Sequence, residues 1–298
     1  MSPTETSTAA RPPSHVGVLG GGRMGSGIAH AFCVSGSTVT ILERDEPSAT
    51  AAREHVRAAL QASIDRGSTS ESLDTLTARV GVVTDYAALA DAELVVEAVP
   101  EEFAMKASAL GRVEEQLADA AWLATNTSSL SVTALAATLK RPERLCGMHF
   151  FNPVPASGLV EIVVGASSDP ELVDLATGWV KALGKTPIVV ADAPGFASSR
   201  LGVALGLEAI RMVEEGVASP EDIDAAMVLG YKHPVGPLRL TDIVGLDVRL
   251  DIAEYLHQKL GERFRPPELL TAMVARGDLG RKSGHGFYDW TATEASKQ

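Results

Sequence analysis

The sequence is poor in cysteine, aromatic residues and positive charge, and each shortage excludes a class of protein. Its 298 residues hold two cysteines, Cys33 and Cys146, without the paired spacing of a disulfide framework or a cysteine metal site. We therefore expect a cytoplasmic protein in a reducing compartment. The net charge of −12 argues against a nucleic-acid partner, because binding phosphates along a strand requires a basic face. Aromatic residues make up 5%, so the core must consist mainly of Ala, Val and Leu.

Long apolar runs are also missing. No stretch approaches the length that spans a bilayer, so we expect no membrane partner. The first fourteen residues, MSPTETSTAARPPS, are polar and lack the apolar stretch of a signal peptide. We predict a disordered tail over residues 1–14.

Glycine, in contrast, is abundant and clustered near the start of the predicted fold. In HVGVLGGGRMGSGIAHAF, an apolar strand at 16–19 is followed by Gly20, Gly22 and Gly25, and by a helix over about 24–34. In the G-x-G-x-x-G pattern the first glycine permits a tight turn and the second lets backbone approach a pyrophosphate. The third allows the helix to pack closely on the strand. The free N–H groups at the helix N-terminus can then bind phosphate, so the pattern predicts a dinucleotide site.

The residue that ends the second predicted strand, 38–42, suggests which dinucleotide is bound. Glu43 follows that strand, 23 residues after Gly20. A carboxylate there can accept hydrogen bonds from both ribose hydroxyls, and it would repel the 2′-phosphate of NADP. Arg44 could instead pair with that phosphate. We favour NAD.

Strand and helix patterns alternate from residue 15 to 191, as is typical of a parallel sheet covered on both faces. Residues 196–275 have helical periodicity and no convincing strand. The predicted fold class is α/β: a Rossmann-type doubly wound sheet over 15–191, followed by an all-helical C-terminal domain over 192–298. A helical domain this rich in alanine and leucine often packs against a copy of itself, so we expect a homodimer.

Three polar segments follow predicted strands: VVEAVPEE, ATNTSSLSV and MHFFNPVP. Open α/β sheets bind ligands outside the carboxyl ends of their strands, so we expect these segments to converge on one site.

His149 lies in the third of these segments. If the next strand returns antiparallel around Pro155, His149 stands opposite Glu161. The carboxylate would fix the imidazole tautomer and stabilise its protonated form, leaving the other ring nitrogen to exchange a proton. An alcohol oxidised beside a nicotinamide needs such a base. The alternative interpretation is an ion pair at a domain boundary.

The second segment contains Asn126-Thr127-Ser128-Ser129. Ser128 could bind a substrate oxygen, whereas Ser129 is the expected N-cap of a helix beginning near Leu130. A role in capping alone is equally open for this run. The other histidines are expected to be structural or solvated: His15, His30, His55, His233, His257 and His285.

The chain resembles the 3-hydroxyacyl-CoA dehydrogenases, most closely the shorter 3-hydroxybutyryl-CoA dehydrogenases. The resemblance rests on the segments already quoted, on DAPGF and on ASPEDIDAAMVLGYKHPVGPLRLTDIVGLD and GRKSGHGFYDW, and it runs from residue 15 to 290. It implies NAD-dependent, reversible oxidation of an (S)-3-hydroxyacyl-CoA to the 3-oxoacyl-CoA, with short acyl chains expected.

The resemblance also implies roles for individual residues. His149 matches the catalytic histidine, Glu161 its partner carboxylate, and Ser128 a residue that contacts substrate and nicotinamide. The remaining matched positions are implied cofactor contacts: Glu101, Lys106, Asn152 and Lys282.

Two regions depart from the family pattern. In PGFASSR, Ser199 replaces an asparagine that lines the family's active site, and serine lacks the second donor of the amide. At the CoA-binding positions, Ala59 and Arg66 stand in place of a serine and a lysine. Arg66 could hold a CoA phosphate or could simply be a solvated helix end. These departures leave room for a sugar-acid dehydrogenase of the gulonate type. A further alternative is an NAD-binding protein without turnover.

Overall fold

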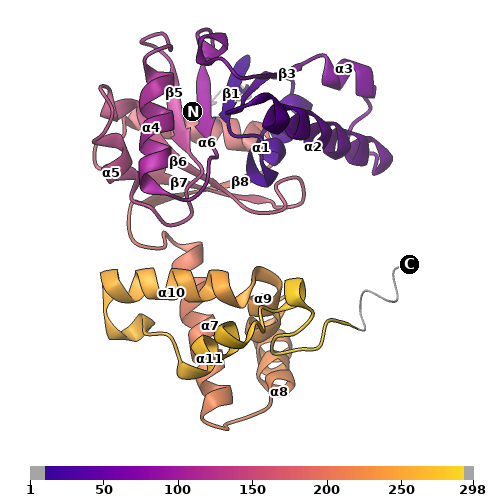
Figure 1. Ribbon diagram of the computed structural model, residues 1–298, viewed down its shortest axis with the longest axis vertical. Helices are drawn as coiled ribbons and strands as arrows, with labels where there is room; N and C mark the ends of the chain where they lie inside the picture. Colours follow the sequence, from indigo (N-terminus) through magenta and orange to yellow (C-terminus); the bar gives the residue numbers. More distant parts are fainter. Residues whose placement is uncertain (1–10, 292–298) are drawn as a thin grey trace, which may run out of the picture. The chain divides into compact units, whose positions relative to one another are not determined.

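The computed structural model describes residues 11–291, and the chain divides into two compact units, residues 1–193 and 194–298. The first unit contains one eight-stranded sheet in the order β3-β2-β1-β4-β5-β6-β7-β8 (Figure 1). The strands are β1 (His15–Leu19), β2 (Thr38–Leu42), β3 (Val80–Val83), β4 (Leu94–Glu97), β5 (Trp122–Thr125), β6 (Leu145–Phe150), β7 (Leu159–Val164) and β8 (Thr186–Ala191). All neighbours pair in parallel except β6 and β7.

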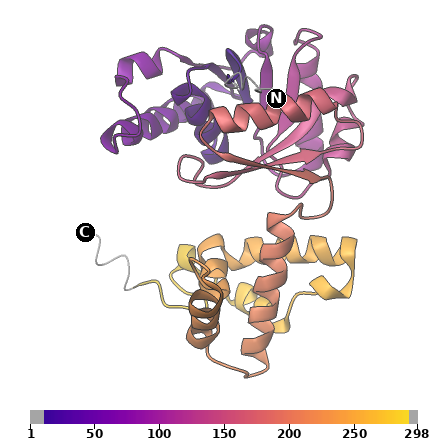
Figure 2. The ribbon, with the colours of Figure 1, turned by 180° about the vertical axis from the view of Figure 1, so that it is seen from behind.

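Helices cover both faces of this sheet. Helix α4 lies in front of the sheet in Figure 1, and α6 lies in front of it when the molecule is seen from behind in Figure 2. The helices of this unit are α1 (Arg23–Val34), α2 (Glu46–Asp65), α3 (Leu73–Thr77), α4 (Phe103–Glu114), α5 (Val132–Ala136) and α6 (Pro170–Ala182). The predicted doubly wound fold is confirmed.

The core of the first unit explains why its strands read as apolar runs. Strands β4 and β5 are buried along their whole length, as expected for parallel strands covered on both sides. One hydrophobic cluster joins the sheet to α1, α2 and α6. Phe32 of α1, Leu60 of α2 and Leu172 of α6 are fully buried in it. This packing fixes the ends of the strands, where the polar segments lie.

The antiparallel pair β6–β7 has the register predicted from the sequence. His149 is opposite Glu161, and Phe150 is opposite Val160. Because the chain reverses between these strands, the carboxylate of β7 stands beside the histidine of β6.

The ordered chain begins before the predicted boundary of the tail. Residues 1–10 of the predicted disordered segment lie outside the described residues. Pro13, however, is buried, and its carbonyl accepts a hydrogen bond from the Ser37 hydroxyl at 2.7 Å. The carbonyl of Ser14 accepts one from the Thr38 N–H at 2.9 Å. These two residues continue β1 at its N-terminal end, so the predicted disorder does not hold for residues 13 and 14.

The second unit is helical, as predicted for the C-terminal region. Its helices are α7 (Ser198–Glu214), α8 (Pro220–Ala225), α9 (Pro237–Val244), α10 (Leu246–Leu260) and α11 (Glu268–Arg276), with a π-helical turn at Ala226–Gly230 (Figure 1). Val203 of α7, Leu238 of α9 and Leu256 of α10 are fully buried in a core of its own. None of the helices within residues 11–291 is both long and apolar enough to cross a membrane.

A buried carboxylate fastens the C-terminal segment to this helical core. Asp242 of α9 is 0% exposed, and it accepts hydrogen bonds from the N–H groups of Phe287 and Tyr288 at 2.9 Å and from Trp290 Nε1 at 2.8 Å. A Cβ on Gly286 would lie 2.3 Å from Asp242 Oδ1, so this close approach requires glycine. The GHGFYDW sequence thus serves to dock the end of the chain.

We expect Asp242→Ala to lower the free energy of unfolding by about 3 kcal/mol, since one buried and two part-buried donors lose their acceptor at about 1–3 kcal/mol for a fully buried group. Differential scanning calorimetry of the full chain measures the effect. The control is Asp251→Ala on the exposed face of α10, which should stay within about 0.5 kcal/mol of the parent. Equal melting temperatures for the two variants would contradict this account of the docking.

Candidate active site

The glycine loop after β1 fits a dinucleotide pyrophosphate. Gly20 has φ of +89°, which only glycine adopts without strain. A Cβ on Gly25 would lie 1.8 Å from the carbonyl oxygen of Gly20, so the helix can pack on the turn only if residue 25 is glycine. Gly22, in contrast, has open space at its Cβ position, and it begins α1 without a side-chain cap. The loop therefore offers accessible backbone and an uncapped helix N-terminus, which is a binding site for an anion.

Glu43 stands beside this loop at the end of β2. Its Oε1 accepts a hydrogen bond from the Gly21 N–H at 2.6 Å, and its Oε2 accepts one from Arg44 N–H at 3.2 Å. The Arg44 side chain turns away to pair with Asp45 at 3.1 Å and is 83% exposed. The carboxylate is thus held at the strand end where the adenosine ribose of a dinucleotide binds.

The loop after β5 is organised by one carboxylate from the loop after β4. Glu101 Oε1 accepts hydrogen bonds from Thr127 Oγ1 at 2.6 Å, Ser128 N at 2.9 Å and Ser129 N at 3.1 Å. The hydroxyls of Ser128 and Ser129 also lie within 3.3 Å and 3.1 Å of the same oxygen. Two of the three predicted polar segments therefore meet, and Ser128 is held at their junction.

Lys106, which the resemblance implied to be a cofactor contact, is enclosed by protein acceptors. It is 1% exposed, and its Nζ donates to Glu97 Oε1 at 2.8 Å and Val99 O at 3.1 Å and contacts Glu101 Oε2 at 3.2 Å. An ammonium has three protons, and these three acceptors account for all of them. Lys106 thereby anchors Glu101, which in turn holds the serine loop.

Glu97 is the functional-site residue that the sequence analysis missed. It ends β4 at 0% exposure, and Oε2 accepts a hydrogen bond from Thr125 Oγ1 at 2.6 Å. Burial raises the pKa of the Glu97 carboxyl, and the Lys106 ammonium offsets part of that effect. The sequence did contain a signal for this residue. Glu97 ends an otherwise apolar strand, and Lys106 follows it nine residues later.

The surroundings of Glu101 stabilise its charged form more than those of Glu97 do. Burial alone would raise the pKa of Glu101, but the Lys106 ammonium and the hydrogen bonds from Thr127 and Ser128 outweigh it and hold the pKa below its ordinary value. Glu101 therefore stays ionised beside the serine loop at neutral pH.

The predicted helix cap in this loop was wrong. Helix α5 begins at Val132 rather than near Leu130, and Ser131 is its N-cap, accepting from the Ala134 N–H at 3.1 Å. Ser129 is instead bonded to Glu101. Sequence spacing could not separate three serines that all suit a cap.

His149 and Glu161 form a buried pair across β6 and β7. His149 Nδ1 lies 2.7 Å from Glu161 Oε2, and the two residues are 6% and 0% exposed. The Phe151 ring lies 4.4 Å from the imidazole, centroid to centroid. Asn126 links this strand to the serine loop, because its Oδ1 accepts from the Phe150 N–H at 2.8 Å. The three segments predicted to converge are thus joined by hydrogen bonds, and Asn152 follows β6 as an exposed residue.

The remaining predicted residues are not part of this hydrogen-bond network. Arg66 ends α2, whose 20 residues span about 30 Å, so it lies far from Glu43 at the other end. Its Nη2 is 3.4 Å from the Ser63 hydroxyl. In the helical unit, the Lys282 ammonium donates to Asp247 Oδ1 at 2.6 Å. Ser199 is half-buried in the first turn of α7.

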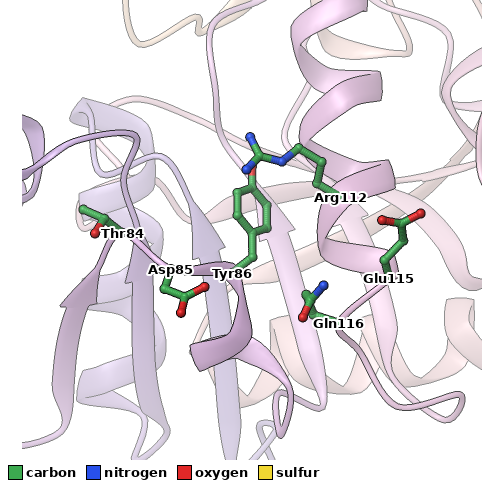
Figure 3. A pocket seen from close by; sticks show the side chains of 6 residues that line it. All are labelled: Thr84, Asp85, Tyr86, Arg112, Glu115 and Gln116. Atoms are coloured by element: carbon green, nitrogen blue, oxygen red, sulfur yellow. The ribbon is translucent and has the colours of Figure 1, made fainter.

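A pocket in the first unit lies outside the network. It is lined by six residues near the ends of β3 and α4, with the Arg112 guanidinium 4.2 Å above the Tyr86 ring (Figure 3). None of the predicted site residues lines it: its walls are Thr84, Asp85, Tyr86, Arg112, Glu115 and Gln116.

We expect Lys106→Met to destabilise the protein without cofactor by about 3–5 kcal/mol, because it leaves the buried Glu97 carboxylate without its cation. Adding Glu97→Gln should recover most of that loss by removing the buried charge. The exposed pair of Lys140 with Glu115 supplies the control, since Lys140→Met should change stability by no more than about 1 kcal/mol. Urea unfolding measures all three. Unchanged stability of the Lys106→Met variant would contradict the anchoring role of Lys106.

Comparison with known proteins agrees with this geometry. Residues 15–193 match the family described as "3-hydroxyacyl-CoA dehydrogenase, NAD binding domain", and residues 195–290 match "3-hydroxyacyl-CoA dehydrogenase, C-terminal domain". A protein of Deinococcus radiodurans named "Probable 3-hydroxybutyryl-CoA dehydrogenase" is 41% identical over 275 residues, which are 92% of this chain and 99% of that protein. A "3-hydroxyadipyl-CoA dehydrogenase" of Escherichia coli is 39% identical over 93% of this chain and 59% of its own length.

Comparison with a solved structure indicates the same family. The crystal structure of (S)-3-hydroxybutyryl-CoA dehydrogenase from Ralstonia eutropha superposes with a TM-score of 0.90 at 37% identity, covering 94% of this chain and 99% of that one. The chain therefore belongs to the 3-hydroxyacyl-CoA dehydrogenase family and carries its NAD-binding domain.

Proposed function

We propose that the protein catalyses the NAD-dependent, reversible oxidation of a short-chain (S)-3-hydroxyacyl-CoA, such as 3-hydroxybutyryl-CoA, to the 3-oxoacyl-CoA. The single observation that carries this proposal is the buried hydrogen bond of 2.7 Å between His149 Nδ1 and Glu161 Oε2. It joins a proton-exchanging side chain to a fixed carboxylate in a unit that carries an NAD-binding domain. The family relationship and the names of its relatives supply the thioester substrate.

In this mechanism His149 removes the proton of the 3-hydroxyl group during oxidation and returns it during reduction. Glu161 holds Nδ1, so we assign the proton exchange to Nε2. The buried carboxylate fixes the ring and stabilises the imidazolium that forms when the proton arrives. NAD, when bound, accepts the hydride from the substrate carbon.

Ser128 is assigned to the substrate oxygen. Its backbone N–H is fixed by Glu101 at 2.9 Å, whereas its hydroxyl has a longer contact of 3.3 Å with the same oxygen. The hydroxyl can therefore turn from Glu101 to a substrate oxygen while the backbone keeps its place. This arrangement supports a pre-positioned donor, which is worth more in a dry site than in water.

The cofactor is assigned to the glycine loop, with Gly20, Gly22 and Gly25 shaping the turn and Glu43 facing the ribose. Glu101, Lys106, Asn152 and Lys282 are proposed as further cofactor contacts, and Ser199 as a substrate contact. Arg66 is kept as a candidate for a CoA phosphate. We also propose a homodimer formed through the helical unit and a cytoplasmic location, the latter from the two buried free cysteines.

The competing activity is oxidation of a sugar acid on the same fold. Ser199 in place of asparagine and Ala59 in place of serine favour it, because both departures fall at positions implied to contact the CoA substrate. A binding protein without turnover is disfavoured, because it has no need of the buried His149–Glu161 pair.

The test of the proposed function follows loss of NADH absorbance with acetoacetyl-CoA, free acetoacetate and a keto-sugar acid. We expect turnover with the thioester alone, because the CoA portion supplies the binding energy that positions the keto group. Turnover with a free acid but not the thioester would move the protein to the sugar-acid activity. Measurable NADH binding without turnover of any of the three would contradict the proposal.

We expect His149→Gln to lower kcat for acetoacetyl-CoA by about 10²- to 10⁴-fold, the usual contribution of general acid–base catalysis. NADH affinity, followed by fluorescence titration, should stay unchanged, since the glycine loop is untouched. His55→Gln on the exposed face of α2 is the matched control and should keep full activity. A His149 variant with parental kcat would remove this histidine from the mechanism.

A further inference from the structure

The turn between β6 and β7 has few hydrogen-bond donors of its own. Its residues 151–158, FNPVPASG, include two prolines, which have no N–H to donate. The pairing of the two strands ends before the turn begins. Within the turn, the N–H groups of Ala156 and Ser157 both donate to the carbonyl of Pro153 at 3.0 Å. These bonds close the turn on itself, but they do not attach it to the rest of the sheet.

Lys185, which directly precedes β8, supplies the missing donors. Its Nζ donates to the carbonyl oxygens of Val154 and Ser157, both at 2.6 Å. The N–H of the next residue, Thr186, donates to the carbonyl of Gly158, also at 2.6 Å. In the part of the chain that the structure describes, no other hydrogen bond reaches the turn from outside β6 and β7. The turn is therefore held against the start of β8, mainly by one ammonium group.

Val154, whose carbonyl Lys185 binds, is also inserted into the core. It is 2% exposed and belongs to the hydrophobic cluster of the first unit. It packs on α1, where a Cβ at Gly27 would lie 2.9 Å from the Val154 Cβ, so this close approach requires glycine. Helix α1 begins at the glycine loop of the proposed cofactor site. A displaced turn would therefore disturb the packing of that helix as well.

The Lys185 ammonium is compensated by these carbonyls and not by an acid. It is half-buried, and burial lowers its pKa. Among residues 11–291 it has no ion pair with a carboxylate. Burial and the positive charges of Arg66 and Lys185 lower the pKa of His30 to about 4, so this neighbouring side chain is neutral at neutral pH. Hydrogen bonds from an ionised donor are roughly twice as strong as neutral ones, so the two carbonyl contacts hold the turn firmly.

The segment between His149 and Val154 carries two groups of the proposed site. Phe151 places its ring 4.4 Å from the imidazole of His149, centroid to centroid. Asn152 is a proposed cofactor contact, and it lies two residues before Val154. The positions of the Phe151 ring and of the Asn152 amide therefore depend on the position of the turn.

We propose that Lys185 is a positioning residue of the active site. Its ammonium holds the turn by two carbonyl groups, and the turn keeps Phe151 against the catalytic histidine and presents Asn152 to the cofactor. The inference rests on the proposed function, which supplies the roles of His149 and Asn152. Lys185 acts through the turn, so it is assigned no contact with the substrate.

The first test replaces the ammonium by an uncharged side chain of similar length. We expect Lys185→Met to lower kcat for acetoacetyl-CoA by about 10²-fold, since a displacement of about 1 Å at the reacting groups has an effect of that size. KM for NADH should rise at the same time, because Asn152 moves with the turn. Lys181→Met, at an exposed lysine of α6, is the matched control and should keep the parental kcat and KM.

The kinetic pattern separates positioning from a purely structural role. Loss of stability alone would lower the melting temperature and the fraction of active enzyme, whereas KM for NADH of the folded enzyme would stay at the parental value. The kinetics are therefore measured well below the melting temperature of the variant, where a rise in KM reports a displaced cofactor contact.

A chemical rescue tests the ammonium directly, and it also serves if Lys185→Met does not fold. Lys185→Cys is alkylated with 2-bromoethylamine, which gives a side chain of lysine length that ends in an ammonium. Iodoacetamide gives a neutral side chain of similar length. Cys33 and Cys146 are buried, and burial raises the pKa of their thiols to about 11 and about 12, so they are not alkylated under the same conditions. We expect the ammonium to restore kcat and KM for NADH, and the neutral amide to leave both impaired.

The remaining outcomes contradict the inference or the proposed function. Parental kcat and KM for NADH in Lys185→Met would overturn the inference and leave the proposed function intact. Equal recovery with both alkylating reagents would assign the effect to the volume of the side chain instead of its ammonium. A lower melting temperature with unchanged kinetics would make Lys185 a structural residue only. No turnover of acetoacetyl-CoA by the parent would overturn the proposed function itself, before any variant is measured.

Discussion

The buried charges of this protein must be compensated, and that requirement arranges its functional residues. Glu161 is bonded to His149, and Lys106 is enclosed by Glu97, Val99 and Glu101. In the helical unit, Asp242 is compensated by backbone and indole donors instead of a cation. Each partnership fixes two segments that are distant in sequence, because a buried charge destabilises the fold once its partner moves. The polar site at the strand ends is therefore tied together by buried hydrogen bonds and ion pairs.

Much of the fold and part of the site could be predicted from sequence because they depend on local spacing. Helix and strand periodicity gave the doubly wound sheet, and a turn centred on Pro155 was enough to bring His149 opposite Glu161. Spacing predicts which residues come together, but it does not predict which donor binds which acceptor. The resemblance matched Lys106 to a cofactor contact, and only the folded chain shows that its three protons also have protein acceptors. Glu97 was quoted only within the segment VVEAVPEE, and only its burial shows that it requires a cation.

The serine loop shows how the same network can be rigid and still responsive to a ligand. Three hydroxyl groups and two backbone N–H groups converge on one oxygen of Glu101. A carboxylate oxygen cannot accept five equally good hydrogen bonds, so the donors compete, and the hydroxyl of Ser128 has the longest contact at 3.3 Å. The backbone contacts keep the loop in place while that hydroxyl is exchanged for a better acceptor. Ser128 can therefore change partner without any rearrangement of the fold.

The two units carry different parts of the activity. The proposed proton exchange, the nucleotide site and the serine loop all belong to the sheet, where strand pairing and buried ion pairs permit little variation. The departure from the family pattern that bears on the acyl group, Ser199, belongs to the helical unit. A side chain exchanged at position 199 would therefore change a proposed contact to the acyl group, and neither the hydride transfer nor the histidine would have to change.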